Sequence, residues 1–416
     1  MKLKKTTRGL QGLAVSLAIG LGLTACSRDY ISGYLYVTAA TRTTTGKISA
    51  YGIDYQTGAL KQLADSPINS GGSNPIAVVA APNGKFIYVV NHDSSQVVEF
   101  SIGTDGKLYP QAPTIDVVKG DNGIVGSFPT AAAIDPAGKF LYVIFTFQDG
   151  FTPLRPGPGG VAVYPIKADN SIGAPLVNTT VGTTPANPLP YIPVGNNPTG
   201  VAVSRVGNLV YIIDQERPAT GPANGVLLAF SQDPASGALT PVVGPVSNGF
   251  KVGTAPSAIA VDPGGRFIYV TDQATNQLYG FSVATGGVPE PFVAGPSTTG
   301  LFPLGLTVDP RGKFLYVANF GSRTVSAYAI DTATGVPSSA GGETSVATGP
   351  TCVTIEPALG IYLYTSNNVD NSVSGEQLDS HTGTLKQIQG TQFSAQELPT
   401  CAVAVANGAH ATQIVQ

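Results

Sequence analysis

A short motif of the form KFLYV recurs seven times along this chain, and this repetition constrains the fold more than any other feature. The copies begin at Gly33, Lys85, Lys139, Asn208, Arg266, Lys313 and Ile361. Upstream of six copies, a Pro starts an apolar run such as PIAVVA at Pro75 or PSAIAV at Pro256. Turns such as DPAG at Asp135 join the two segments, and Asp first, Pro second and Gly fourth suit a type I turn. Each pair of segments therefore predicts a β-hairpin.

A third segment follows each hairpin, and a fourth follows in most copies. Third segments such as QVVEFSI at Gln96 carry the β-branched and aromatic residues that are typical of buried strands. Turns such as DPASGAL at Asp233 lead into the fourth segment. Charged residues make up only 11% of the 416 residues, whereas Gly (51) and Pro (33) are frequent, which fits many short strands and tight turns. The pattern predicts an all-β fold, a seven-bladed β-propeller of four-stranded antiparallel blades.

The end of the chain holds a fragment of the same repeat. PTCAVAV, which starts at Pro399, is an eighth copy of the inner strand, and no second strand follows it. The first blade begins at GYLYV and has no inner strand before it. We therefore predict that the C-terminal strand pairs into the N-terminal blade and closes the ring, which removes the open edges of a linear array. The propeller is expected to be a single domain over residues 34–416.

The N-terminal residues are typical of a signal peptide. MKLKKTTRG is basic, and the apolar stretch LQGLAVSLAIGLGL after it is shorter than a helix needs to span a bilayer. The stretch LTAC, which ends at Cys26, resembles the lipobox of bacterial lipoproteins, whose Cys becomes the first mature residue and carries a diacylglycerol on its sulfur. An ordinary signal peptide, or a short anchor that contains a Cys, is the alternative.

The lipobox interpretation sets boundaries and a location. It predicts a signal peptide over residues 1–25, then the lipidated Cys26 and a short linker over residues 26–33. Acyl chains on Cys26 would anchor the protein to a membrane, because each buried CH2 contributes about 0.8 kcal/mol. Ser27 follows the Cys, and a residue other than Asp here favours the outer membrane in a Gram-negative host. We therefore expect a lipid-anchored protein of the cell envelope, on its periplasmic or surface side.

Several motifs together resemble one family of propellers. DPxGKFLYV, YVVN at Tyr88, YVAN at Tyr316 and the TGxL turns resemble the seven-bladed lactonase family, which includes 6-phosphogluconolactonase-like proteins, and the related YVTN-repeat propellers. The resemblance extends over the chain from about Tyr34 onward. It implies a propeller fold and a lactonase activity with a His and Arg residues around the channel mouth. The inner strands start with PTA, PTG or PSA and carry neither His nor Arg at that point.

In a propeller the connections between strands fall on two faces. First-to-second and third-to-fourth turns share one face, here called the turn face; second-to-third connections and blade-to-blade crossovers share the other, here called the loop face. Nearly all turn-face connections are tight and repetitive. Three loop-face connections are long, and all belong to blades three and four: residues 145–160, 183–197 and 214–225. Long loops on one side of a rigid scaffold often bind ligands, although Pro-rich insertions are also tolerated as plain surface.

Candidate functional residues lie on the loop face. A lactonase needs a group that polarises the carbonyl and a base that activates water, so the catalytic candidates are Arg155, Glu216, Arg217 and His92. The Asp residues that end second strands fit a binding role, and they fit equally well a role in satisfying the loop backbone. The predicted binding face consists of His92, Asp93, Arg155, Asp214, Glu216, Arg217, Asp272 and Arg323.

The sequence argues against several classes of function. The net charge is −3 and Lys and Arg do not cluster after the N-terminus, so nucleic acid is not an expected partner. Trp is absent, which argues against Trp-Asp repeat propellers and quinone-cofactor propellers. Carboxylates are scattered, and neither a His-x-His pattern nor a phosphate loop occurs, so we expect neither a metal nor a cofactor.

Two cysteines occupy the same position of the inner strand. Cys352 and Cys401 both occur in PTC, where other copies hold Ala or Gly, so the position demands a small side chain. They are either small core residues or partners in a disulfide between neighbouring inner strands, which an oxidising compartment would allow.

These observations favour a membrane-anchored envelope lipoprotein whose propeller binds a small molecule or an envelope protein. The alternative is a lactonase-type hydrolase or cycloisomerase that acts on a sugar or aromatic lactone at the channel mouth.

Overall fold

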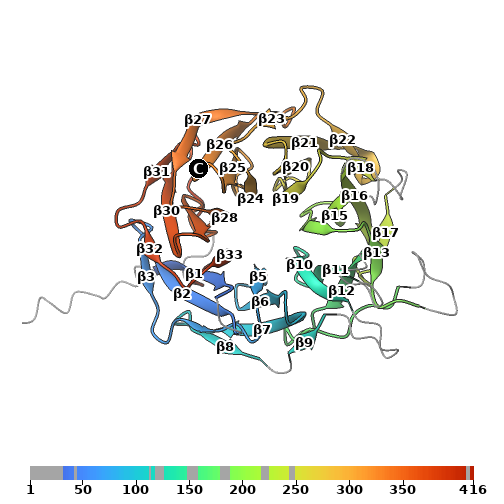
Figure 1. Cartoon of the computed structure of the whole chain (residues 1–416), viewed down its shortest axis with the longest axis horizontal. Helices are drawn as coiled ribbons and strands as arrows, with labels where there is room; N and C mark the ends of the chain where they lie inside the picture. The colour runs from blue at the N-terminus through green and yellow to red at the C-terminus, as the bar shows by residue number, and fades with distance from the viewer. Residues whose placement is uncertain are drawn as a thin grey trace, which may run out of the picture.

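The computed structural model of the chain is a ring of seven antiparallel β-sheets arranged around a central axis (Figure 1). It describes residues 31–41, 45–111, 114–117, 126–147, 158–178, 188–216, 224–242, 249–408 and 413–416. Within these ranges the regular structure is strand, apart from the short 3-10 helix η1 (Thr285–Gly287). The predicted all-β, seven-bladed propeller is confirmed.

Each blade runs from an inner strand at the axis to a fourth strand at the rim of the ring. In blade order one to seven, the inner strands are β33 (Pro399–Ala406), β5 (Pro75–Ala80), β10 (Ser127–Ile134), β14 (Pro198–Val203), β19 (Pro256–Val261), β24 (Pro303–Val308) and β28 (Pro350–Ile355). The second strands are β1 (Ile31–Ala39), β6 (Phe86–Asn91), β11 (Phe140–Phe147), β15 (Leu209–Glu216), β20 (Phe267–Asp272), β25 (Phe314–Asn319) and β29 (Tyr362–Asn367).

The outer half of each blade is less regular. The third strands are β2 (Lys47–Asp54), β7 (Gln96–Ile102), β12 (Gly159–Pro165), β16 (Asn224–Gln232), β21 (Gln277–Val283), β26 (Thr324–Ile330) and β30 (Ser372–Leu378). The fourth strands are β3 (Leu60–Gln62), β8 (Leu108–Pro110), β13 (Ile192–Val194), β17 (Leu239–Pro241), β22 (Pro289–Pro291), β27 (Pro337–Ser345) and β31 (Leu385–Gln387). In five blades a second short strand also pairs with the third strand: β4 (Ile68–Asn69), β9 (Ile115–Asp116), β18 (Phe250–Lys251), β23 (Ser297–Thr298) and β32 (Phe393–Ser394).

The C-terminal strand closes the ring, as the repeat pattern predicts. β33 pairs antiparallel with β1, with Tyr34 opposite Val405 and Tyr36 opposite Val403. The first blade therefore contains strands from both ends of the chain (Figure 1). Cys401 in β33 forms a disulfide with Cys352 in β28, and their Cα atoms lie 5.0 Å apart. This bond joins the inner strands of blades one and seven.

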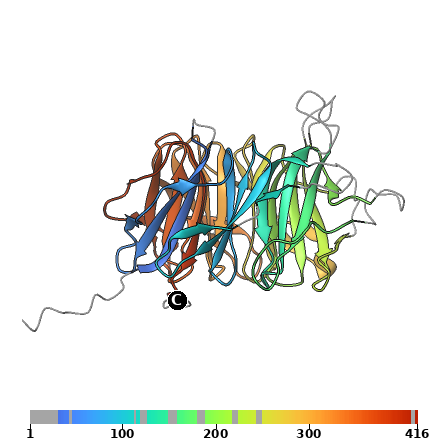
Figure 2. The ribbon, with the colours of Figure 1, turned by 90° about the horizontal axis from the view of Figure 1, so that it is seen from below.

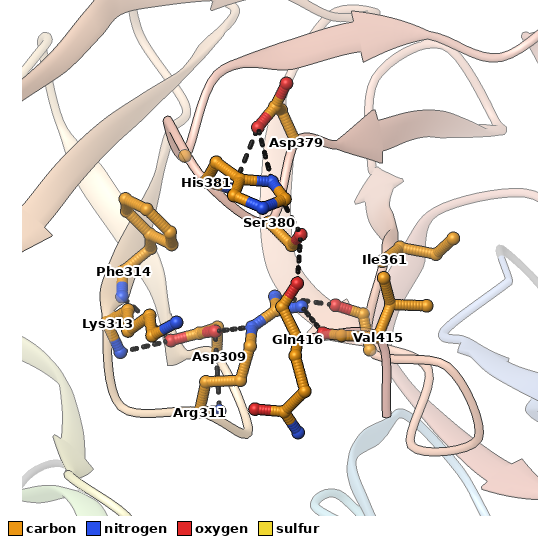
Figure 3. A network of polar contacts seen from close by, with 12 residues as sticks. Asp309, Arg311, Lys313, Phe314, Ile361, Asp379, Ser380, His381, Val415 and Gln416 are labelled. Carbon is orange, nitrogen blue, oxygen red and sulfur yellow. Dashed lines mark hydrogen bonds and ion pairs between the residues drawn. The ribbon is translucent and has the colours of Figure 1, made fainter. Parts of the chain in front are cut away.

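The last residues of the chain, 413–416, lie on the turn face and dock against blades six and seven (Figure 3). The backbone N–H of Val415 donates to the carbonyl of Leu359 at 2.9 Å. The Arg311 side chain donates to the Val415 carbonyl at 2.7 Å and to the Gly360 carbonyl at 2.9 Å, while its Nε lies 2.5 Å from the Asp309 carboxylate. The C-terminal segment thus fastens the turn after β24 to the turn after β28.

The repeated Tyr of the KFLYV motif joins neighbouring blades. In six blades its buried hydroxyl donates to a backbone carbonyl in the third-to-fourth-strand turn of the next blade. These pairs are Tyr36–Gly106 (2.8 Å), Tyr88–Asn170 (2.8 Å), Tyr211–Gly287 (3.5 Å), Tyr269–Gly335 (2.7 Å), Tyr316–Gly383 (2.9 Å) and Tyr364–Gly58 (2.6 Å). The hydroxyl of the seventh, Tyr142, is buried without a hydrogen-bond partner among the described residues. The motif therefore encodes the contact between blades as well as the strand.

An Asp recurs in the DPxG turns because its carboxylate binds the backbone of the turn. In Asp309 one carboxylate oxygen accepts the backbone N–H groups of Lys313 at 2.7 Å and Phe314 at 2.8 Å, and Asp135 and Asp262 bind their turns in the same way. All three side chains are buried. Because buried N–H groups must be paired, the carboxylate fixes the entry into the second strand in these three blades.

The domain begins earlier than the repeat pattern predicts, because β1 starts at Ile31 rather than at Tyr34. The expected signal peptide and Cys26 lie outside the described residues. Within the described part of the chain, no helix has the length and apolar character needed to cross a membrane.

Candidate functional site

The two faces of the ring are its upper and lower sides in Figure 2. The C-terminus lies on the turn face, on the lower side of Figure 2. On the loop face the second strands end in polar residues, which the sequence predicts to be a binding face. Arg155 and Arg217 of that predicted set lie outside the described residues.

Asp214 and Asp272 serve the backbone rather than an exposed surface. Asp214 accepts the N–H groups of Asn196 at 3.1 Å and Asn197 at 2.7 Å, and burial raises its pKa to about 6. Asp272 accepts the N–H groups of Thr254 and Ala255 from the preceding crossover. Both carboxylates are fully buried. They hold the crossovers that precede blades four and five, so in this structure neither forms part of the exposed face that was predicted.

Two further predicted residues lie apart from each other on the ring. Glu216 is the last residue of β15 in blade four and is half-buried. Arg323 lies in the turn before β26 in blade six, is exposed, and has a left-handed backbone with φ of 60°. Hydrogen bonds from Thr348 lower the pKa of the nearby Asp370, and the charge of Arg323 adds to this effect.

His92 and Asp93 form a close pair where β6 ends. The His92 Nδ1 atom lies 2.6 Å from Asp93 Oδ1, and the same oxygen accepts a hydrogen bond from Asn74 Nδ2 at 3.1 Å. The side chains of His92 and Asp93 are 30% and 55% exposed. Partial burial opposes ionisation of Asp93, but the hydrogen bonds from His92 and Asn74 outweigh it and lower its pKa. The pair therefore combines an ionised carboxylate with a solvent-accessible imidazole.

The backbone fixes this pair against the entrance of the inner strand. The N–H of His92 donates to the Asn74 carbonyl at 2.9 Å, and Asn74 directly precedes Pro75, the first residue of β5. The histidine thus lies near the axis on the loop face, at the junction between blades two and three.

An aromatic pair from blade three completes the cluster. The rings of His92 and Phe128 lie 5.1 Å apart between centroids, and Phe128 meets Phe147 edge-to-face at 5.8 Å. The Phe128 N–H donates to Ser95 Oγ at 3.1 Å, which ties blade three to blade two. We call His92, Asp93, Asn74, Phe128 and Phe147 the His92 cluster. No sequence motif singled out the two Phe residues, although SFPT carries a bulky residue directly before the Pro of an inner strand.

The backbone of Phe128 is in the left-handed region, with φ of 58°. The same conformation occurs at three other residues that precede an inner-strand Pro: Asn74 (54°), Phe302 (54°) and Leu398 (53°). Asn tolerates this region, whereas Phe and Leu are uncommon there and carry a cost. Strain of this kind persists where the surrounding structure enforces it, often at functional sites. The crossover geometry thus places a half-buried ring beside His92.

The geometry of the His92 cluster suits proton transfer. Because Asp93 binds Nδ1–H, it selects the imidazole tautomer whose Nε2 is left to accept a proton. The phenyl rings beside it give an apolar contact surface for a ligand. Across the described residues no three His, Cys, Asp or Glu side chains come together in a group that could hold a metal ion.

The described residues thus form a seven-bladed β-propeller with a His–Asp pair on its loop face. A family model for the lactonase seven-bladed β-propeller matches residues 28–144 and 242–355, which together make up more than half of the chain. The protein therefore belongs to the lactonase family of seven-bladed β-propellers.

Solved structures support the same fold. A candidate 6-phosphogluconolactonase from Bacteroides uniformis superposes with a TM-score of 0.68 at 17% identity and covers 90% of this chain and 100% of its own. The periplasmic gluconolactonase of Pseudomonas aeruginosa gives 0.67 at 19% identity, with 90% and 99% covered. Apo AztD from Citrobacter koseri gives 0.55 at 14% identity, with 90% and 98% covered. At these identities the similarity shows the fold alone. No curated protein sequence matches this chain.

Proposed function

We propose that this protein is a lactonase-type hydrolase that opens a lactone ring at the loop face, with His92 as its general base. The observation that carries the proposal is the contact between His92 and Asp93 at 2.6 Å, exposed on the loop face of a lactonase-family propeller. This reading is the alternative of the sequence analysis. Family membership supports it more than it supports a binding module without catalysis.

The reaction uses the pair in a conventional way. His92 Nε2 takes a proton from a water molecule, and the resulting hydroxide attacks the lactone carbonyl carbon. The tetrahedral intermediate collapses with cleavage of the ring C–O bond, and the imidazolium returns its proton to the leaving alkoxide oxygen. Asp93 stays ionised, keeps Nδ1 protonated and stabilises the imidazolium, while Phe128 and Phe147 contact the ring face of the substrate.

The test is a hydrolysis assay of the purified propeller against a panel of sugar, aryl and alkyl lactones. We expect turnover of at least one lactone, and we expect His92→Ala to lower kcat/KM by about 10² to 10⁴. His381→Ala is the matched control, because His381 also lies beside an Asp, with its Nδ1 atom 4.0 Å from Asp379, but is 84% exposed and on the turn face.

Two outcomes would contradict the proposal. Turnover that His92→Ala leaves unchanged would place the chemistry elsewhere in the molecule. A protein that hydrolyses no lactone in the panel but retains one of them in equilibrium dialysis would be a binding module, the first expectation from the sequence.

We also propose that the protein is attached to the cell envelope through lipid on Cys26. Ile31 starts β1 at the turn face, opposite Asp54, which begins the turn after β2. The chain from Cys26 to Ile31 spans at most about 17 Å when fully extended. A lipid on Cys26 would therefore hold the turn face near the bilayer and direct the His92 cluster away from it. Fractionation of cells that express Cys26→Ser tests this, since a variant that stays in the membrane fraction would refute it.

A further inference from the structure

One position of the blade repeat is aromatic in six blades and acidic in the seventh. In each blade, the residue directly before the Tyr of the KFLYV motif lies on the second strand. The position in question is the third-strand residue that pairs with it. In blades one to six it is Tyr51, Phe100, Tyr164, Phe230, Phe281 and Tyr328. In blade seven the residue opposite Leu363 is Glu376. An acid thus occupies a place that the fold otherwise fills with a large, mostly apolar side chain.

Glu376 is completely buried, and neither of its carboxylate oxygens has a hydrogen-bond partner in the described structure. Leu363 and Leu378, which share its side of the blade, pack with Phe314 and Val325 of blade six. Glu376 therefore faces the contact between blades six and seven, here called the blade 6–7 seam. An unpaired charge in such a place is expensive, and the usual response of the group is to take up a proton.

A strip of hydroxyl and amide groups leads from the loop face toward Glu376. Ser372 and Ser374 alternate with their neighbours along β30, so they share the side of Glu376. Asn367 donates to Ser372 Oγ at 3.2 Å and to Ser374 Oγ at 3.0 Å, and Thr365 donates to Asn367 Oδ1 at 3.0 Å. The strip ends at Ser374, two residues before Glu376 on the same side of β30, and does not bond to the carboxyl group.

The other ionisable groups on the strands and turns around Glu376 form hydrogen bonds with other groups or are exposed to solvent. The Tyr364 hydroxyl donates to the Gly58 carbonyl, and the Tyr316 hydroxyl donates to the Gly383 carbonyl. Glu343 on β27 accepts a hydrogen bond from Thr324, and both Glu343 and Lys386 on β31 are exposed. Glu356, which follows β28, binds four backbone N–H groups of its own turn. Glu376 therefore lacks an ion-pair partner in the described structure.

We propose that Glu376 makes the blade 6–7 seam a pH-sensitive joint, which is tight while the carboxyl group is protonated and loosens when it ionises. The proposal does not depend on the enzymatic activity. It rests on the replacement of a ring by an acid, on the missing partners and on the apolar surroundings.

The direction of the effect follows from the burial of the carboxyl group. Burial raises the pKa of Glu376 from 4.5 to about 8, so the folded state holds a proton that the unfolded state has already lost. The contribution is therefore fully present below pH 4.5 and is lost as the pH rises toward 8. The folding equilibrium constant should fall by about tenfold per pH unit over this range, and then level off.

The experiment compares the thermal unfolding of the full chain with that of Glu376→Gln from pH 5 to pH 9 at constant ionic strength. We expect the wild-type melting temperature to fall with pH relative to that of the variant, with a gap that opens up to about pH 8. Glu343→Gln, which changes an exposed carboxylate on the fourth strand of blade six, is the control and should follow the wild type. At pH 9, hydrogen exchange in β26, β27 and β30 should be faster in the wild type than in Glu376→Gln.

Parallel melting curves for the wild type and Glu376→Gln at every pH would overturn the proposal. Equal exchange in β26, β27 and β30 at pH 9 would do the same. If Glu376→Gln does not fold, Glu376→Phe takes its place, because it restores the type of side chain found in the other six blades.

Discussion

Asp309 on the turn face and Asp93 on the loop face are the same residue type in opposite situations. Asp309 is fully buried and is bound by two backbone N–H groups and by Arg311. Asp93 is 55% exposed and is bound by an imidazole and a side-chain amide. A carboxylate whose acceptor capacity is taken up by the backbone holds the fold and has little left for chemistry. The comparison separates a carboxylate that maintains the ring from one that remains accessible to a ligand.

The comparison gives a rule that can be tested. Changes on the turn face and at the closure should lower stability, whereas changes in the His92 cluster should lower the proposed hydrolase activity with little effect on stability.

Deleting residues 399–416 should abolish folding of the ring. The deletion removes the inner strand of blade one, the disulfide to Cys352 and the backbone contacts at Leu359, and it leaves β1 with an open edge. We expect aggregation or the loss of a cooperative melting transition in circular dichroism. Deleting residues 413–416 alone is the milder control, because it keeps β33 in place. An unchanged melting temperature after the longer deletion would refute the closure.

Asp309→Ala should destabilise the protein by about 3–5 kcal/mol. It leaves Arg311, whose side chain is only 3% exposed, without its carboxylate, and the N–H groups of Lys313 and Phe314 without their acceptor. Chemical denaturation measures this loss. His92→Ala, a change at a partly exposed residue on the other face, should stay within about 0.5 kcal/mol of the wild type. Equal losses of unfolding free energy in the two variants would contradict the difference drawn between Asp309 and the His92 cluster.

The architecture could be predicted because it repeats. The KFLYV motifs and the Pro-initiated strands give the number of blades. PTCAVAV reveals the closing strand because it repeats the inner-strand motif at the end of the chain, where no second strand follows. His92 stood out for the opposite reason, since it breaks the pattern. In both cases the information lies within a few neighbouring residues.

The sequence did not reveal contacts between blades. Phe128 lies beside His92 because the left-handed backbone conformation of Phe128, directly before the Pro of β10, turns the ring there. Whether Asp214 points to solvent or to its own loop depends on backbone N–H groups some seventeen residues upstream, such as that of Asn197. Glu376 sits in an ordinary third-strand segment, and only the register against Leu363 shows that it replaces a ring. Each depends on partners from another segment, which a local pattern does not contain.

The motif tyrosines give the finest test of how blades are joined. Tyr364→Phe should lose about 1 kcal/mol of unfolding free energy, because its hydroxyl donates to the Gly58 carbonyl across the closing blades at 2.6 Å. Tyr142→Phe removes a buried hydroxyl that has no partner in the described structure, so it should be neutral or slightly stabilising. The two variants make the same chemical change at the same position of the repeat, and urea denaturation compares them directly. Equal losses would mean that the phenol packing, rather than the hydrogen bond between blades, is what the recurring Tyr supplies.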